Sequence, residues 1–174
     1  MHSTVFIHDS ADVSDKAIIG ERTSIWNWVQ VREGASIGTD CVLSKGVYID
    51  KDVTIGDKVK IQNNVSIYHG VSIEDGVFVG PHVCFTNDLN PRAVNSDFEP
   101  ASEDEWTETK TLIKRGASLG ANSTIVAGTT IGEFSLIGAG SVVTKEVPAF
   151  ALVYGNPAKV VGKVDHNGQI IERI

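Results

Sequence analysis

A period of six residues runs through most of the chain and restricts the folds available to it. Counted from Ile7, every sixth residue is apolar for fourteen consecutive positions up to Phe85, and the period resumes from Ile113 to Val143. Two residues before each of these positions stands a small or β-branched side chain, as Val59 does before Ile61. Residues two apart on a strand face the same side, so each hexad predicts a short strand with one large and one small buried residue. An α-helix would need a period of 3.6 and would not tolerate so much Val, Ile and Gly.

Isolated hexads cannot bury their inward pairs, so the strands must stack on one another at a spacing of about 4.8 Å. The sequence therefore predicts an all-β solenoid. We expect tight corners where glycine, which lacks a Cβ, follows the large residue. These glycines are Gly20, Gly38, Gly56, Gly80, Gly120, Gly132 and Gly138. The period alone fixes neither the number of hexads per coil nor the hand of the coil.

One excursion interrupts the period, from residue 86 to residue 112, and is far longer than the single corner that would continue it. Excursions of this length are usually functional or disordered. We expect a substrate-contacting loop whose first part, residues 86–92, is polar and whose later part carries an acidic run at residues 103–105 with Trp106. Residues 148–150 should end the solenoid. Residues 165–169 predict a hairpin turn, so the chain divides into a solenoid domain at 1–164 and a tail at 165–174.

Composition and charge restrict the kinds of partner that we expect for this chain. No apolar run approaches the roughly 20 residues of a membrane span, and the N-terminus has no secretory signal, so we expect a cytoplasmic protein without a membrane partner. The net charge of −7 argues against nucleic acid. Residues 113–174 nevertheless carry six basic and four acidic groups, which indicates either an anionic ligand or an uneven solvated surface. Cys41 and Cys84 are too scattered for a zinc site, and no metal is expected.

The closing segments, GAGSVVTKEVP at residues 138–148 and YGNPAKVVG at 154–162, are similar to those of CoA-dependent hexapeptide-repeat acyltransferases. A narrower resemblance spans nearly the whole chain. It rests on residues 25–26, 59–68, 80–81, 85–87, 90–92 and 116–122. These segments resemble the N-acetyltransferases that act on the 3-amino group of nucleotide-linked dideoxy sugars, including the UDP-2-acetamido-3-amino-2,3-dideoxy-glucuronate enzyme and its dTDP-3-amino-3,6-dideoxyhexose relatives.

The resemblance implies a left-handed parallel β-helix with three hexads per coil, a triangular prism in which residues 18 apart are stacked. It also implies a homotrimer with active sites between subunits, acetyl-CoA as the acyl donor, and a UDP- or dTDP-linked amino sugar as the acceptor, for surface polysaccharide biosynthesis. The pantetheine arm should lie along the coils at residues 113–147, where backbone N–H groups could meet the cofactor's amides and phosphates. The implied cofactor-binding residues are Ala127, Gly128, Ala139, Lys145, Lys159 and Lys163.

With positions 18 apart stacked, His69 lies below Asn87 at one corner, and Asn64 lies below His82 at another. We interpret His69 as the general base, Asn87 as a contact of the sugar or the acetyl carbonyl, and His82 as a site residue delivered by the neighbouring subunit. The substrate-binding candidates are Asn63, Asn64, Glu74, Asn90 and Arg92, with Glu74 also able to orient a histidine and Arg92 to pair with a diphosphate or carboxylate. His69 departs from the glucuronate enzymes, in which we expect an acidic residue at this position.

Three other functions fit the pattern less well. The chain could acetylate the oxygen or nitrogen of another small acceptor on the same fold, or it could be a non-catalytic trimeric binding protein. The γ-class carbonic anhydrases share the prism and bind zinc with three histidines, but the five histidines here, at positions 2, 8, 69, 82 and 166, show no paired ligand spacing. Trp26 and Trp28 lie outside the inward pattern and are expected at a subunit interface.

Overall fold

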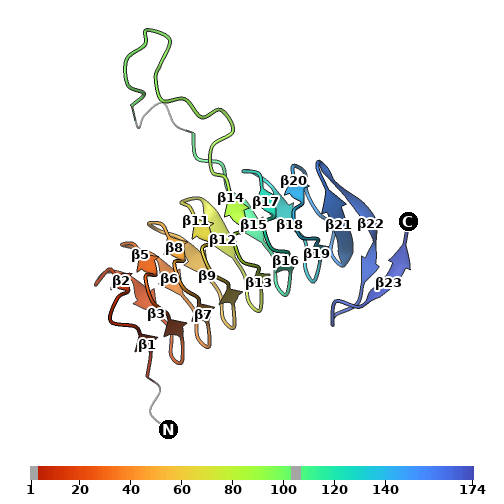
Figure 1. Cartoon of the computed structure of the whole chain (residues 1–174), viewed down its shortest axis with the longest axis horizontal. Coiled ribbons are helices and arrows are strands. Elements are labelled where there is room, and N and C mark those ends of the chain that lie inside the picture. Colours follow the sequence, from red (N-terminus) through yellow and green to blue (C-terminus); the bar gives the residue numbers. More distant parts are fainter. Residues whose placement is uncertain (1–3, 103–106) are drawn as a thin grey trace.

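The computed structural model describes residues 4–102 and 107–174, so the acidic run at 103–105 and Trp106 lie outside the described residues. Within these ranges the chain forms a left-handed parallel β-helix, a prism of three parallel sheets from which one long loop projects between β14 and β15 (Figure 1). The all-β fold predicted from the six-residue period is therefore confirmed. Neither described range contains a helix long and apolar enough to cross a membrane.

Each sheet takes every third strand of the chain. Sheet A contains β1 (Phe6–Ile7), β4 (Ser24–Ile25), β7 (Val42–Leu43), β10 (Lys60–Ile61), β13 (Phe78–Val79), β16 (Ser118–Leu119), β19 (Leu136–Ile137), β21 (Ala151–Gly155), β22 (Ala158–Val164) and β23 (Ile170–Arg173). Sheet B contains β2 (Asp12–Val13), β5 (Gln30–Val31), β8 (Tyr48–Ile49), β11 (Ser66–Ile67), β14 (Cys84–Phe85), β17 (Thr124–Ile125) and β20 (Val142–Val143). Sheet C contains β3 (Ile18–Ile19), β6 (Ser36–Ile37), β9 (Thr54–Ile55), β12 (Val71–Ile73), β15 (Thr111–Ile113) and β18 (Thr130–Ile131).

The strand pairing confirms the coil of three hexads. Ser66 pairs with Tyr48, its equivalent one coil below, and across the loop the sequence offset becomes larger, because Cys84 pairs with Thr124. Three edges join the sheets: the A–B edge, which follows each strand of sheet A, the B–C edge, which follows each strand of sheet B, and the C–A edge. The long loop leaves and rejoins the prism at the B–C edge.

The core is a column of the predicted inward pairs. Ile61 and Val59, like their equivalents in the other inner coils, are almost fully buried. The first coil is the exception, because no coil packs on its outer side among residues 4–102 and 107–174, and Phe6 and Ile7 are both exposed. Burial of each large side chain contributes roughly 1.5–3 kcal/mol, so stacking is what holds hexads that are too short to persist alone.

The glycines that follow the large residues have a different role from the one predicted. A Cβ added to Gly20 would lie 2.4 Å from the carbonyl carbon of Gly38 on the next coil, and Gly38 meets Gly56 in the same way. These glycines therefore permit close approach between coils. The left-handed backbone of the corner falls two residues later, as at Arg22 with a φ of 61°.

The prism does not end at residues 148–150, and the prediction was wrong by one strand. Phe150 has a φ of 59° and stacks on Phe134, one coil below, with 5.5 Å between ring centroids, so these residues form a regular C–A corner. Strand β21 then pairs in parallel with β19 before the chain reverses into antiparallel β22 and β23. The turn predicted at residues 165–169 joins β22 to β23, where Asp165 N–H donates to the Gln169 carbonyl at 2.9 Å.

Candidate active site

The B–C edge and its loop carry half of the residues predicted to be catalytic or substrate-binding. His69 occupies the corner between β11 and β12, and the loop holding Asn87, Asn90 and Arg92 emerges one coil further on. Ala127 and Gly128 follow β17, and Lys145 follows β20, so these three of the predicted cofactor-binding residues continue the same edge and form the candidate cofactor corner. The structure thus aligns a candidate base, a polar loop and a candidate cofactor corner along one line parallel to the prism axis.

A second group lies on the A–B edge, with sheet B between the two groups. His82 N–H donates to the carbonyl of Asn63 at 3.0 Å, and His82 and Asn64 share the same left-handed backbone, which confirms that Asn64 lies directly below His82. Ala139 lies further along this edge, after β19. Within one chain, therefore, these residues do not meet His69.

Three predicted residues lie away from both groups. Glu74 is at the C–A edge, where its carboxylate accepts a hydrogen bond from Arg115 N–H at 2.9 Å, so it does not orient a histidine in this chain. Lys159 and Lys163 lie on β22, and Lys163 forms an ion pair with Glu172 at 2.7 Å. Lys145, by contrast, belongs to the group on the B–C edge and is exposed to solvent there.

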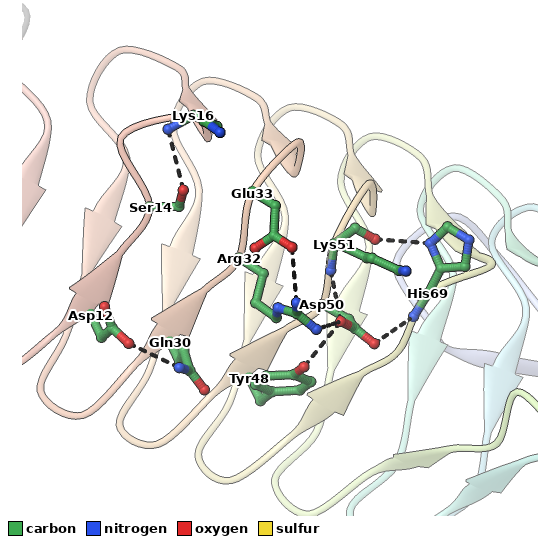
Figure 2. A network of polar contacts seen from close by, with 10 residues as sticks. All are labelled: Asp12, Ser14, Lys16, Gln30, Arg32, Glu33, Tyr48, Asp50, Lys51 and His69. Carbon is green, nitrogen blue, oxygen red and sulfur yellow. Dashed lines mark hydrogen bonds and ion pairs between the residues drawn. The ribbon is translucent and has the colours of Figure 1, made fainter. Parts of the chain in front are cut away.

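The His69 ring is held on two sides. Its Nδ1 lies 3.0 Å from the carbonyl oxygen of Lys51, directly below it (Figure 2), and its Nε2 lies 3.4 Å from a carboxylate oxygen of Glu108. The His69 side chain is only 23% exposed. Glu108 belongs to the returning arm of the loop. The ring is therefore fixed by the prism through Nδ1, and Nε2 is the nitrogen presented to the loop.

Asp50 organises the corner beneath His69. Its Oδ1 accepts hydrogen bonds from Arg32 at 3.0 Å, from the Tyr48 hydroxyl at 3.0 Å and from Lys51 N–H at 2.8 Å, and its Oδ2 accepts one from His69 N–H at 3.2 Å (Figure 2). The Asp50 side chain is 13% exposed. One carboxylate thus fixes the backbone of both residues, Lys51 and His69, that set the position of the imidazole.

The pKa of Asp50 reflects these contacts. Burial raises the pKa, but the hydrogen bonds from Lys51 N–H, His69 N–H and the Tyr48 hydroxyl, together with the charge of Arg32, outweigh burial and hold the pKa below its ordinary value. Burial also raises the pKa of Tyr48, which keeps its hydroxyl proton for the bond to Asp50. Asp50 is therefore a carboxylate at every pH at which the protein is expected to work.

We expect Asp50→Asn to destabilise the fold by about 2 kcal/mol at pH 7, because an amide turns an NH₂ group toward donors that the carboxylate accepts. A lowered carboxyl pKa contributes stability above the unfolded-state value, about 3.9, and that stability is lost as pH falls through the lower folded value. The gap between wild type and variant in thermal unfolding should therefore narrow below about pH 4. Asp9→Asn, at an exposed carboxylate, is the control. A gap of equal size at pH 7 and pH 3 would contradict this assignment.

The cofactor corner departs from the expectation in one respect. Ala127 N–H donates to the Thr86 hydroxyl at 2.9 Å, and Gly128 N–H donates to the Thr111 hydroxyl at 3.1 Å. Both N–H groups are thus used within the chain, so they are not donors for a bound cofactor. What the corner offers is small size, since an Ala and a Gly let a chain-like ligand approach the backbone. The two threonines also fasten the start and the end of the loop to the next coil.

Sequence reasoning missed Asp50 and Glu108. Lys51 is one coil before His69, so the stacking rule applied downward from His69 would have found the corner that Asp50 organises. Glu108 is outside the hexad period, and nothing in the sequence places the returning arm of the loop beside His69. Asn87 follows Thr86 at the start of the loop and is half-buried, and within the described part of the chain its amide has no hydrogen-bond partner. No group of three metal-ligating side chains occurs among the described residues.

The prism, its candidate cofactor corner and its polar loop agree with the left-handed β-helix acyltransferases, the class that the sequence resembles. The bacterial transferase hexapeptide pattern of six repeats matches residues 16–51, 52–87 and 110–145, more than half of the chain. The chain belongs to this hexapeptide-repeat family.

Relatives within the family share parts of the chain. Over 55 residues it is 60% identical to the dTDP-3-amino-3,6-dideoxy-alpha-D-galactopyranose 3-N-acetyltransferase of Aneurinibacillus thermoaerophilus, a match that covers 32% of this chain and 29% of that relative. The match thus spans less than a third of the relative's length.

Two solved structures show the fold over a longer range. A hexapeptide-repeat acetyltransferase of Vibrio cholerae O1 biovar eltor, complexed with acetyl coenzyme A, is 27% identical with a TM-score of 0.62 over 76% of this chain and 72% of its own. A galactoside acetyltransferase in complex with coenzyme A is 25% identical with a TM-score of 0.64 over 77% of this chain and 66% of its own.

Proposed function

We propose that the protein transfers the acetyl group of acetyl-CoA to the amino group of a nucleotide-linked amino sugar, at the 3-amino position of a UDP- or dTDP-linked deoxysugar. The observation that carries the proposal is the His69 corner, whose Nε2 is presented on the same edge that continues through Ala127 and Gly128. The relative that is 60% identical over 55 residues is named for transfer to a dTDP-linked 3-amino sugar, and two structures of similar fold contain acetyl coenzyme A or coenzyme A.

The reaction needs a neutral amine beside a thioester, stabilisation of the oxyanion and removal of a proton. His69 Nε2 takes a proton from the acceptor nitrogen as that nitrogen attacks the acetyl carbonyl carbon. In this proposal Asn87, whose amide has no hydrogen-bond partner within the described residues, holds the sugar or the oxyanion. No covalent acetyl-enzyme is needed, because the amine attacks the thioester directly.

The complete site is formed by a homotrimer in this proposal. The A–B edge residues Asn63, Asn64 and His82 lie on the far side of sheet B from His69, so a neighbouring subunit is needed to bring them to the loop. Trp26 and Trp28 on the A–B edge are 45% and 62% exposed in a single chain, as expected for side chains that a partner covers. Light scattering coupled to size exclusion should give the mass of a trimer, and a fully active monomer would contradict the shared site.

Substrate specificity tests the proposal directly. Thiol release from acetyl-CoA should be at least about tenfold faster with a UDP- or dTDP-linked 3-amino sugar than with a hexosamine lacking the nucleotide, because the diphosphate and base add binding energy that an isolated sugar lacks. The panel should include a galactoside and a simple amine. Equal turnover of a galactoside would favour O-acetylation of another small acceptor on the same fold. Binding of the sugar nucleotide without any thiol release would favour a non-catalytic trimer.

A further inference from the structure

The contacts of His69 determine which of its nitrogens can take a proton. A carbonyl oxygen only accepts hydrogen bonds, so the Nδ1 that lies 3.0 Å from the Lys51 carbonyl must carry a hydrogen. In the neutral ring the lone pair is then on Nε2. Nε2 faces Glu108 at 3.4 Å. A lone pair and a carboxylate repel each other, so this contact is attractive only when a proton lies between them.

Glu108 therefore faces the working nitrogen of the ring, where an acceptor amine has to arrive. The Glu108 side chain is 37% exposed and comes from the returning arm of the loop, whereas His69 belongs to the rigid prism. A carboxylate on the Nδ1 side would orient the ring, but that side is already taken by Lys51. On the Nε2 side a carboxylate instead meets whatever cation enters the site.

We propose that Glu108 is a specificity residue that binds the acceptor in its ammonium form and holds it against Nε2 of His69. The inference rests on the function proposed above and adds to it the reason that the acceptor is an amine. An ammonium nitrogen donates to the carboxylate and to the Nε2 lone pair at once. A hydroxyl oxygen has one hydrogen and no charge, so it cannot satisfy both groups.

An ammonium nitrogen can bind between Glu108 and Nε2 of His69 if the Glu108 side chain moves slightly. Two hydrogen bonds of about 2.8–2.9 Å at a tetrahedral nitrogen place their acceptors about 4.6 Å apart, against 3.4 Å here, so Glu108 has to withdraw by roughly 1 Å. The side chain is partly exposed and belongs to the loop, and Gly70 and Gly128 lie beside the returning arm at the same edge. Entry of the ammonium thus replaces the proton shared between His69 and Glu108.

The protons and electrons balance without any further reactant. The ammonium loses one proton to Nε2, and the freed lone pair forms the bond from nitrogen to the acetyl carbonyl carbon. The carbon–sulfur bond then breaks with its electron pair going to sulfur. The second nitrogen proton goes to the thiolate. The proton on His69 is then shared with Glu108 as that carboxylate closes again, and it replaces the proton that left for solvent when the ammonium entered.

Other charges around Glu108 are the same in wild type and in a Glu108 variant. Lys51 lies below His69 on the B–C edge (Figure 2), Lys110 follows on the segment of Glu108, and the Asp50 carboxylate is held by four donors beneath the ring. A comparison of pH profiles between wild type and Glu108→Gln therefore isolates the charge of Glu108.

The test uses the full chain and compares Glu108→Gln with wild type. A sugar amine with a pKa of about 8 is mostly a cation at pH 6.5 and mostly neutral at pH 9.5. Glu108→Gln should lower kcat/KM for the 3-amino nucleotide sugar by about tenfold at pH 6.5, the loss of one charge-assisted hydrogen bond, and by less than about threefold at pH 9.5. The analogue with a hydroxyl in place of the amine should inhibit both enzymes with equal strength. Glu99→Gln, an exposed carboxylate on the same loop, should change neither value.

Every outcome of this comparison either supports or overturns the role proposed for Glu108. A Glu108→Gln enzyme equal to wild type at both pH values would overturn it while leaving the acetyltransferase proposal intact. An equal loss at both pH values, or weaker inhibition by the hydroxyl analogue, would also overturn it, because a general loop defect has no dependence on the charge of the acceptor. A wild-type enzyme that acetylates no nucleotide amino sugar would contradict both proposals.

Discussion

His69→Asn is expected to lower kcat by at least about a hundredfold at pH 7, because a positioned histidine contributes about 10²- to 10⁴-fold by accepting a proton in the transition state. Part of the loss should return near pH 9.5, where the acceptor amine loses its proton without help. The variant removes Nε2, while its backbone N–H can still bond to Asp50. Steady-state kinetics of thiol release from pH 6 to 9.5 measure both effects.

The matched control is His8→Asn, the same substitution at a histidine of the first coil. It should leave kcat unchanged. Both variants must keep the oligomeric mass of the wild type, since a corner residue lies near the expected interface. A His69→Asn enzyme within tenfold of wild type across pH 6 to 9 would remove the general base, leaving direct attack by the amine with Asn87 and other donors carrying the catalysis.

Asn87→Ala should behave differently from His69→Asn. If the Asn87 amide holds the oxyanion or the sugar, its loss should lower kcat/KM by roughly 10²- to 10³-fold, as for the removal of one oxyanion donor. The loss should persist at every pH, since no proton equilibrium is involved. The pH profile, rather than the size of the effect at one pH, therefore separates the two roles.

Asn167→Ala, in the terminal hairpin, is the control for an asparagine far from the B–C edge. It should retain wild-type kinetics. Recovery of Asn87→Ala activity at high pH would contradict the assignment and place Asn87 in the proton path. A fall in thermal stability that parallels the fall in activity would show instead that Asn87 supports the loop.

The sequence predicts the prism well because one period decides nearly every inward position. Ile61 and Val59 must face the core in any stacked-hexad arrangement, and the structure buries both. The same rule failed at residues 148–150, because the sequence around Phe150 shows no hexad pattern. Phe150 nevertheless forms the C–A corner, where its ring stacks on that of Phe134. The glycines that follow the large residues were predicted at the right positions but for a different reason. They permit neighbouring coils to approach closely and do not form the left-handed turn of the corner.

The candidate site was predictable only where it belongs to the prism. The stacking of residues 18 apart predicted Asn64 under His82, which the structure confirms. That Ala127 and Lys145 lie on the same edge as His69 follows only from the structure. The partner of Nε2 was not predictable, because Glu108 reaches His69 through a loop whose path follows no period. The N–H group of Ala127 could not be assigned from sequence either, since its acceptor at Thr86 stands on the other side of the long loop.

Because the coils stack at a constant spacing, corresponding corners along the B–C edge are separated by whole multiples of that spacing. From the corner of His69 to that of Lys145 the edge climbs three coils, about 14 Å at 4.8 Å per coil. Adding or deleting one complete coil between them would change that span by about 4.8 Å and leave the contacts within every other coil unchanged. If the acyl donor binds along this edge as proposed, its accommodated length changes only in whole coils, and one coil can be added or removed without altering the residues at either end of the edge.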